Sequence, residues 1–246
     1  MEKRLRKIRE EKTFSSLNKK SFLIFIFLIL FSYCFIAQPV EQINKIRFSL
    51  WADIDAYPGS EEAKEDAGDL SEYGFAIKRI KEVAPLLVEG MIYGWEFSYR
   101  PYDKTREVAE EMIVKPIVNP SYVAKNIDYS SPWLEENIFN CWVQYNKNEY
   151  EKAEYEKWSV IKNPVIHGIG YGEVKDGFKG IVDACNDALK NAVRSYYRNV
   201  IKNKPKEIRG KVLLKSTPLI GVDAGRYMIN LDFFLECGKI IEYKVF

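Results

Sequence analysis

The side chains of this chain that could do acid–base or metal chemistry are few. His167 is the only histidine among 246 residues, so an imidazole metal site or a histidine-activated nucleophile would have to use this one side chain. Glu96 and Glu173 could form a carboxylate pair for glycoside hydrolysis. A glutamate that alternates outward on a strand is usually just solvated, however. The sequence therefore predicts no catalytic residue and no metal ligand.

Three cysteines follow the N-terminal apolar segment. They are Cys141, Cys185 and Cys237, with spacings of 44 and 52 residues. These spacings match no zinc template, and an odd count permits at most one disulfide among them. Each lies in an apolar, periodic segment, so we expect each to act as a small buried hydrophobic residue. The sequence leaves their disulfide state open.

A run of alternating glycines stands before a long helical pattern. Gly168, Gly170 and Gly172 resemble a phosphate cradle, but their spacing fits neither the dinucleotide fingerprint nor the P-loop. They share one face of a predicted strand, and a face without side chains allows a close approach. The helix that follows has a stripe of small residues that includes Ala184 and Ala188. The glycines therefore predict close helix packing, with no cofactor.

Two groups of side chains are candidates for a partner surface. One is an aromatic strand face, which could stack on sugar rings or on a partner chain, and the other is the basic face of the long helix, which could meet an anionic partner. The alternatives are a buried core face and a solvated helix face. The candidate residues are Tyr93, Trp95, Phe97, Tyr99, Lys190, Arg194 and Arg198.

The elements that position these residues are predicted from periodicity. In the first half we expect a strand over 46–56, an acidic loop over 57–68, and a helix from residue 69 that ends at Pro85. Residues 86–99 are predicted as a strand because large residues alternate there. Residues 108–118 and 146–157 are ambiguous.

The second half has clearer patterns. We expect strands over 138–145 and 164–173, a helix over 178–201, and strands over 208–216, 226–236 and 239–246, with turns at 218–225 and at Gly238. This order predicts an α+β fold with antiparallel sheets that are each covered by one main helix. The two halves could be two similar sandwich units. Their boundary falls in the Asn-, Ser- and Pro-rich stretch 119–132, which gives domains over 38–125 and 126–246.

The N-terminus predicts the compartment. Residues 1–20 carry eight Lys or Arg against three Glu, and residues 21–37 contain no charge. This pattern is typical of a secretory signal peptide. An uncleaved anchor helix and lipidation at Cys34 are alternatives, and an anchor would be the only contact with the membrane. All three predict an exported body in the periplasm or outer envelope.

The exported body is slightly acidic. Without residues 1–37, Lys+Arg falls from 37 to 29 and Asp+Glu from 35 to 32, so the formal charge moves from +2 to −3. A nucleic-acid binder would normally carry a clustered cationic face. We therefore exclude nucleic acid as a partner.

Part of the second half resembles a known bacterial domain. The segments HGIGYGEV and DACNDALKNAVRSYYRNV are similar to the Gly-rich strand and Ala-rich helix of a domain found in small envelope lipoproteins and in periplasmic flagellar assembly proteins. The resemblance covers about residues 163 to 236. It implies a non-enzymatic α+β module for envelope assembly and protein contacts, with no catalytic residues to transfer. The chain departs from that pattern in its aromatic first half and in lacking a convincing lipobox.

Two functions remain open from the sequence. The first is an exported, non-catalytic envelope or periplasmic module that binds an envelope protein or a cell-wall component. The second is a secreted hydrolase that uses carboxylates to act on glycans. The first is favoured because no nucleophile–base or metal constellation is visible.

Overall fold

The computed structural model describes residues 44–54, 73–159 and 162–243. The predicted signal or anchor segment, and with it Cys34, lies outside these residues, as does the predicted acidic loop. Within the described ranges, no helix combines the length and hydropathy that a membrane crossing requires.

Four α-helices and nine strands are present in the described residues. The first part of the chain contains β1 (Lys45–Asp53), α4 (Gly74–Ile92), β2 (Trp95–Arg100), β3 (Glu111–Pro116), α5 (Pro120–Ala124) and β4 (Asp128–Glu135). The second part contains β5 (Ile138–Asn146), α6 (Glu149–Trp158), β6 (Val165–Glu173), a 3-10 turn (Val174–Asp176), α7 (Phe178–Val200), β7 (Glu207–Leu214), β8 (Leu219–Asp223) and β9 (Arg226–Ile241).

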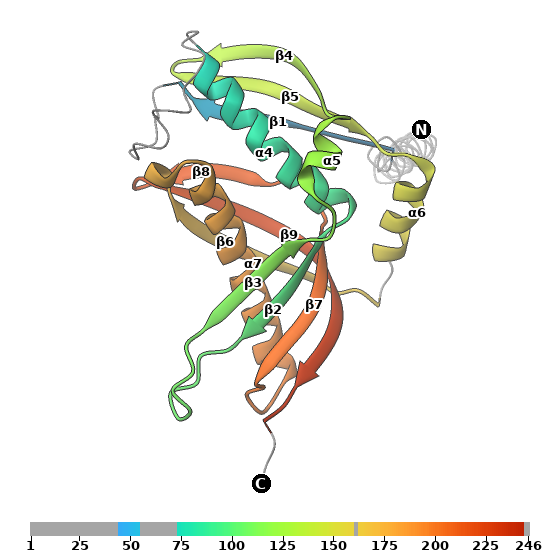
Figure 1. Ribbon diagram of the computed structural model, residues 1–246, viewed down its shortest axis with the longest axis vertical. Helices are drawn as coiled ribbons and strands as arrows, with labels where there is room; N and C mark the ends of the chain where they lie inside the picture. The colour runs from blue at the N-terminus through green and yellow to red at the C-terminus, as the bar shows by residue number, and fades with distance from the viewer. Residues whose placement is uncertain (1–43, 55–72, 160–161, 244–246) are drawn as a thin grey trace, which may run out of the picture. The chain divides into compact units, whose positions relative to one another are not determined.

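The strands form two antiparallel sheets, which confirms the predicted α+β class (Figure 1). The first has the order β1-β5-β4, and the second has the order β3-β2-β7-β9-β6, with β8 paired to β9. Helix α4 packs on β1 and β5, and α7 packs on β6 and β9. Each sheet contains strands from both sides of residue 125, where the sequence predicted a domain boundary, and residues 43–246 form one compact unit.

Helix α4 is longer than the sequence predicted. We expected it to end at Pro85 and a strand to begin at Leu86, but the helix continues through Pro85 to Ile92. A proline inside a helix costs about 3 kcal/mol. Here Leu87 and Val88 are fully buried on the far side of the proline, and burial of such side chains contributes roughly 1.5–3 kcal/mol each. Packing therefore outweighs the local cost.

The aromatic strand begins only after a sharp turn at Gly94. Its φ of +80° belongs to the left-handed region, and a Cβ at this position would lie 2.1 Å from the Val212 carbonyl oxygen. The predicted strand was therefore wrong for residues 86–94 and right from Trp95 onward.

The Asn-, Ser- and Pro-rich stretch 119–132 contains α5 and most of β4. Two predicted turns were wrong. The predicted turn 218–225 contains β8, and β9 runs through Gly238 without a break. Gly238 marks a close approach to Arg209, whose carbonyl oxygen would lie 2.3 Å from an added Cβ. The ambiguous stretches became β3 and α6, and α6 begins with a capping box of Asn148 and Glu151.

Helix α7 meets β6 through backbone atoms, as the glycine and alanine patterns predicted. An added Cβ would lie 2.0 Å from the Ala188 carbonyl at Gly168, 2.1 Å from the Ala184 carbonyl at Gly170, and 1.9 Å from the Gly180 carbonyl at Gly172. The two spacings match, because two strand residues span about 6.6 Å and four helix residues about 6 Å. The glycines therefore form a packing surface, which confirms the architectural interpretation.

Candidate functional site

The predicted aromatic face belongs to the core. Trp95, Phe97 and Tyr99 are only 2–4% exposed, while Tyr93 lies outside β2 and donates a hydrogen bond from its hydroxyl to Glu151 at 2.7 Å. Buried rings cannot offer an exposed stacking surface to a sugar. The core interpretation of this face therefore holds, and of these rings only Tyr99 lines the pocket described below.

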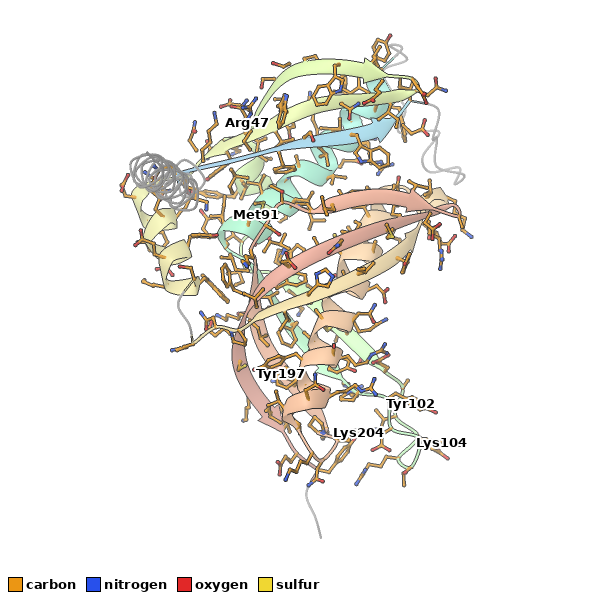
Figure 2. All side chains as sticks on the ribbon, turned by 180° about the vertical axis from the view of Figure 1, so that it is seen from behind. Arg47, Met91, Tyr102, Lys104, Tyr197 and Lys204 are labelled. Carbon is orange, nitrogen blue, oxygen red and sulfur yellow. The ribbon has the colours of Figure 1, made fainter. Side chains whose placement is uncertain are left out.

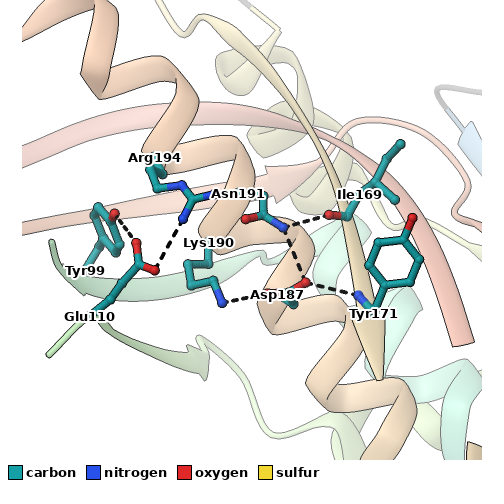
Figure 3. A network of polar contacts seen from close by, with 8 residues as sticks. All are labelled: Tyr99, Glu110, Ile169, Tyr171, Asp187, Lys190, Asn191 and Arg194. Carbon is teal, nitrogen blue, oxygen red and sulfur yellow. Dashed lines mark hydrogen bonds and ion pairs between the residues drawn. The ribbon is translucent and has the colours of Figure 1, made fainter. Parts of the chain in front are cut away.

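Side chains from the middle of α7 form hydrogen bonds with the backbone of the edge strand β6 (Figure 3). Asp187 accepts a hydrogen bond from the Tyr171 backbone N–H at 3.1 Å, and the Asn191 amide donates to the Ile169 carbonyl at 2.9 Å. Lys190 forms an ion pair with Asp187 at 2.6 Å. Side chains that satisfy an edge strand protect it from pairing with other chains. Lys190 therefore supports this arrangement and lies apart from the pocket.

One turn further along α7, Arg194 reaches the segment before β3. Its guanidinium lies 3.4 Å from Glu110, which also accepts a 2.6 Å hydrogen bond from the Tyr99 hydroxyl (Figure 3). Burial, followed by this hydrogen bond, raises the pKa of Tyr99. The contact ties the end of α7 to β2 and β3, on the opposite side from β6.

A pocket of about 260 Å³ opens at this end of α7. Its walls come from β2, from the last turns of α7, from the loop that follows, and from the start of β7. Figure 2 shows Tyr197 of the helix and Lys204 of the loop at the same end of the fold. The lining residues are Tyr99, Pro101, Arg194, Tyr197, Arg198, Ile201, Lys202, Asn203, Lys204, Pro205 and Ile208.

The pocket is cationic. Its lining contains two arginines and two lysines but no carboxylate. Arg194 is paired with Glu110, whereas Arg198, Lys202 and Lys204 are exposed and have no ion pair within the described part of the chain. Cations at a helix C-terminus also complement its dipole, an effect of about 0.3–1 kcal/mol each. Their convergence on a cavity makes this the candidate site for an anionic partner.

The lining also contains apolar residues, which form the floor of the pocket. Tyr197 and Ile208 are buried, and the Tyr197 hydroxyl has no hydrogen-bond partner among the described residues. Burial, followed by the neighbouring Cys237 thiol, raises the pKa of Tyr197. The pocket thus combines a charged rim with a floor that favours apolar groups.

The cysteine predictions were partly right. Cys141 and Cys185 are buried and free, and burial raises the pKa of the Cys185 thiol to about 12. Cys237 is free but exposed, which corrects its predicted burial. It lies opposite Gly210 where the register between β7 and β9 shifts, with its sulfur 3.9 Å from the Tyr196 hydroxyl.

His167 does not activate a nucleophile within the described structure. Its Nδ1 lies 2.9 Å from Asp232, and the Ser216 hydroxyl donates to the other oxygen of the same carboxylate at 3.2 Å. A histidine base must contact the nucleophile directly, whereas here both side chains contact the aspartate. No group of three or more potential metal ligands occurs within the described ranges.

The candidate glycosidase carboxylates are not brought together. Glu96 is on β2 and Glu173 is on β6, with two strands between them. Glu96 pairs with Lys211, which lies opposite Glu236, and Glu173 pairs with Arg226 at the other end of β9. The two register positions are ten residues apart on β9, which is a length of about 33 Å along the strand at about 3.3 Å per residue. Glycoside hydrolysis requires carboxylates about 5–9.5 Å apart.

The sequence did not indicate which ionisable side chains are buried, and Glu89, Lys147 and Glu151 are three of them. Glu89 is fully buried and accepts hydrogen bonds from Trp95 Nε1 at 2.9 Å and from the Val118 N–H at 3.2 Å, and burial raises its pKa to about 7. Burial likewise lowers the pKa of Lys147 to about 8. Glu151 accepts hydrogen bonds from two tyrosines and caps α6. None of the three lines the cationic pocket.

Among the pocket residues, sequence reasoning did not single out Lys202, Lys204 or Tyr197 as candidates. Lys202 and Lys204 belong to the segment KNKPK (202–206), which follows the predicted helix 178–201, and Tyr197 was not part of the predicted stripe of small residues. The available signal was the density of cations after Arg194 and Arg198, together with the apolar Ile201 between them.

The fold and the pocket define an α+β protein with a cationic site built by one helix end. A protein-family model matches residues 33–243, so the chain belongs to that family. The chain is also similar to an uncharacterised protein of Treponema pallidum (strain Nichols), with 26% identity over 208 residues, which is 82% of this chain and 83% of the relative. No solved structure matches the chain.

Proposed function

We propose that this protein is an exported, non-catalytic module of the bacterial envelope that binds a protein or cell-wall partner through an anionic group. The observation that carries the proposal is the pocket at the end of α7, where Arg198, Lys202 and Lys204 converge without a carboxylate. Buried or half-buried cations without partners are costly, whereas exposed ones around a cavity attract anions and raise their rate of association.

The non-catalytic part of the proposal is supported by the arrangement of the ionisable groups. Among the residues that the structure describes, the single histidine contacts an aspartate and no nucleophile, and Glu96 and Glu173 lie on distant strands. Export is supported by the charged leader and the apolar segment 21–37. The resemblance to an envelope-assembly domain that we drew from the sequence pattern of residues 163–236 points to the same compartment, although the comparisons with known proteins add no support to it. The Treponema relative is bacterial.

Binding to envelope components tests the proposal. The full chain, purified in mild detergent, is incubated with cell-wall sacculi and separately with envelope extract, followed by sedimentation and cross-linking. We expect the triple variant Arg198→Glu, Lys202→Glu, Lys204→Glu to lose about tenfold or more of the binding of wild type. A matched control reverses Lys125, Lys162 and Lys175, which are exposed elsewhere and change the net charge by a similar amount.

Two outcomes contradict the proposal. The first is equal binding by wild type and the pocket variant, because the cations would then play no part. The second is turnover of glycan by the purified chain that is abolished by Glu96→Gln or Glu173→Gln. That result would establish the carboxylate-dependent hydrolase in its place.

A further inference from the structure

We infer that the cationic pocket captures the free C-terminal carboxylate of a peptide whose last side chain is apolar. The inference rests on the proposed function and names the chemical group that the site recognises. Two sources share this chemistry: the end of an envelope protein, and the end of a cell-wall stem peptide.

The size of the pocket indicates a terminal group. Its volume of about 260 Å³ lies below the range of about 300–1,000 Å³ that is typical of sites for whole small molecules. The walls are formed by the end of a helix, a short loop and two strands, so the pocket lies at the surface with room for the rest of a longer ligand outside. A partner would therefore insert one residue.

The rim and the floor require different properties of that residue. Arg198 can donate two parallel hydrogen bonds to a carboxylate, and Lys202 and Lys204 add charge beside it. The half-buried side chains of Ile201 and Pro101 offer an apolar surface, and the buried Ile208 and Tyr197 also belong to the lining. A peptide C-terminus carries an anion and a side chain on the same carbon, so it can satisfy both surfaces at once.

The helix end favours a singly charged anion over a phosphate. The last carbonyls of α7 carry the equivalent of about −0.5 charge, which offsets part of the positive charge of the rim. A phosphate would also leave the apolar floor without contacts. A carboxylate carries less negative charge than a phosphate and so is repelled less by these carbonyls, and an adjacent apolar side chain can contact the floor.

The test is a set of short fluorescent peptides measured by anisotropy with the full chain. A peptide that ends in leucine with a free carboxylate is compared with its carboxamide and with a peptide that ends in glycine. We expect the free acid to bind about tenfold or more tightly than the amide, and leucine to bind more tightly than glycine. Arg198→Gln should remove the preference for the acid, whereas Lys175→Gln should keep it.

Additional measurements distinguish an envelope protein from a cell-wall stem peptide as the ligand, and a carboxylate from a phosphate. A peptide that ends in D-alanine represents the cell wall, and tighter binding of either this peptide or the leucine peptide identifies the source. Equal binding of acid and amide, equal binding of leucine and glycine, or competition by inorganic phosphate at peptide concentrations would overturn the inference. If one of these occurs while the triple charge reversal still abolishes envelope binding, the inference fails and the proposed function stands.

Discussion

At α7 the helix and the sheet meet through backbone atoms, whereas at α4 they meet through large side chains. Gly170 leaves no room for a Cβ against Ala184 and Ala188, while α4 buries Leu87, Val88 and even Glu89 completely. The first contact tolerates no added atom. The α4 contact is made by large apolar side chains and a buried carboxylate, which can be replaced by side chains of similar size. The comparison shows that one fold can hold one helix by close backbone packing and another by the burial of large side chains.

The largest effect is expected from adding a single methyl group to the α7 contact. Gly170→Ala should destabilise the protein by about 4 kcal/mol or prevent folding, because the new Cβ would lie 2.1 Å from two backbone atoms. Chemical denaturation monitored by circular dichroism measures this. The control is Gly221→Ala on β8, where the nearest atom is 3.9 Å away and we expect a change within about 0.5 kcal/mol. Equal effects at the two glycines would contradict the close-packing interpretation.

The free energy of unfolding should depend on pH through Glu89, the buried carboxyl group of α4. Burial raises the pKa of Glu89 from 4.5 to about 7, so between these values the folded protein binds more protons than the unfolded chain. Stability from this group is therefore complete below about pH 4.5 and is lost as the pH rises to about 7, by at most about 1.4 kcal/mol per pH unit.

Denaturation midpoints of wild type and Glu89→Gln across this range measure the effect. The glutamine keeps an acceptor for the Trp95 indole N–H but does not titrate, so its stability should depend less on pH. Parallel pH profiles of the two proteins would show that Glu89 is not perturbed.

The smallest effects are expected on the outer side of α7. Asn191→Ala removes the hydrogen bond to the Ile169 carbonyl and should cost about 1 kcal/mol. Lys190→Ala removes only a partly exposed ion pair with Asp187 and should change stability by less than about 0.5 kcal/mol. Equilibrium denaturation of both variants gives the comparison. A larger loss of stability for Lys190→Ala than for Asn191→Ala would show that the Lys190–Asp187 ion pair, and not the Asn191 amide, stabilises the edge of β6.

Much of the α7 region could be predicted from sequence because its patterns are local. The glycine alternation and the helix stripe each lie within one continuous segment, and each indicates its own face. The helix through Pro85 could not be predicted, because the packing that outweighs the proline comes from distant strands. The same holds for β9 through Gly238, where a glycine that indicated a turn is required by the neighbouring Arg209 backbone.

The candidate site was predicted only in part for a related reason. Arg194 and Arg198 were visible as a basic helix face, and both line the pocket. Tyr99 lies about a hundred residues earlier and was assigned to the aromatic face, since nothing in the sequence shows that β2 adjoins β7 near the end of α7. The pocket exists only when β2 and β7 are paired next to the end of α7. Its residues therefore cannot be identified before that strand pairing is known.

The ladder of glycines under α7 has a consequence for recognition. Because each small helix residue is seated over one glycine, the helix could slide along the strand only in whole steps of about 6 Å, and intermediate positions would drive Cβ atoms into backbone. The helix backbone is therefore held in one register on β6, and Arg194 and Arg198 extend from a backbone of fixed position. A ligand that binds at this helix end does not have to order that backbone, so the ordering cost falls on the exposed side chains of Arg198, Lys202 and Lys204.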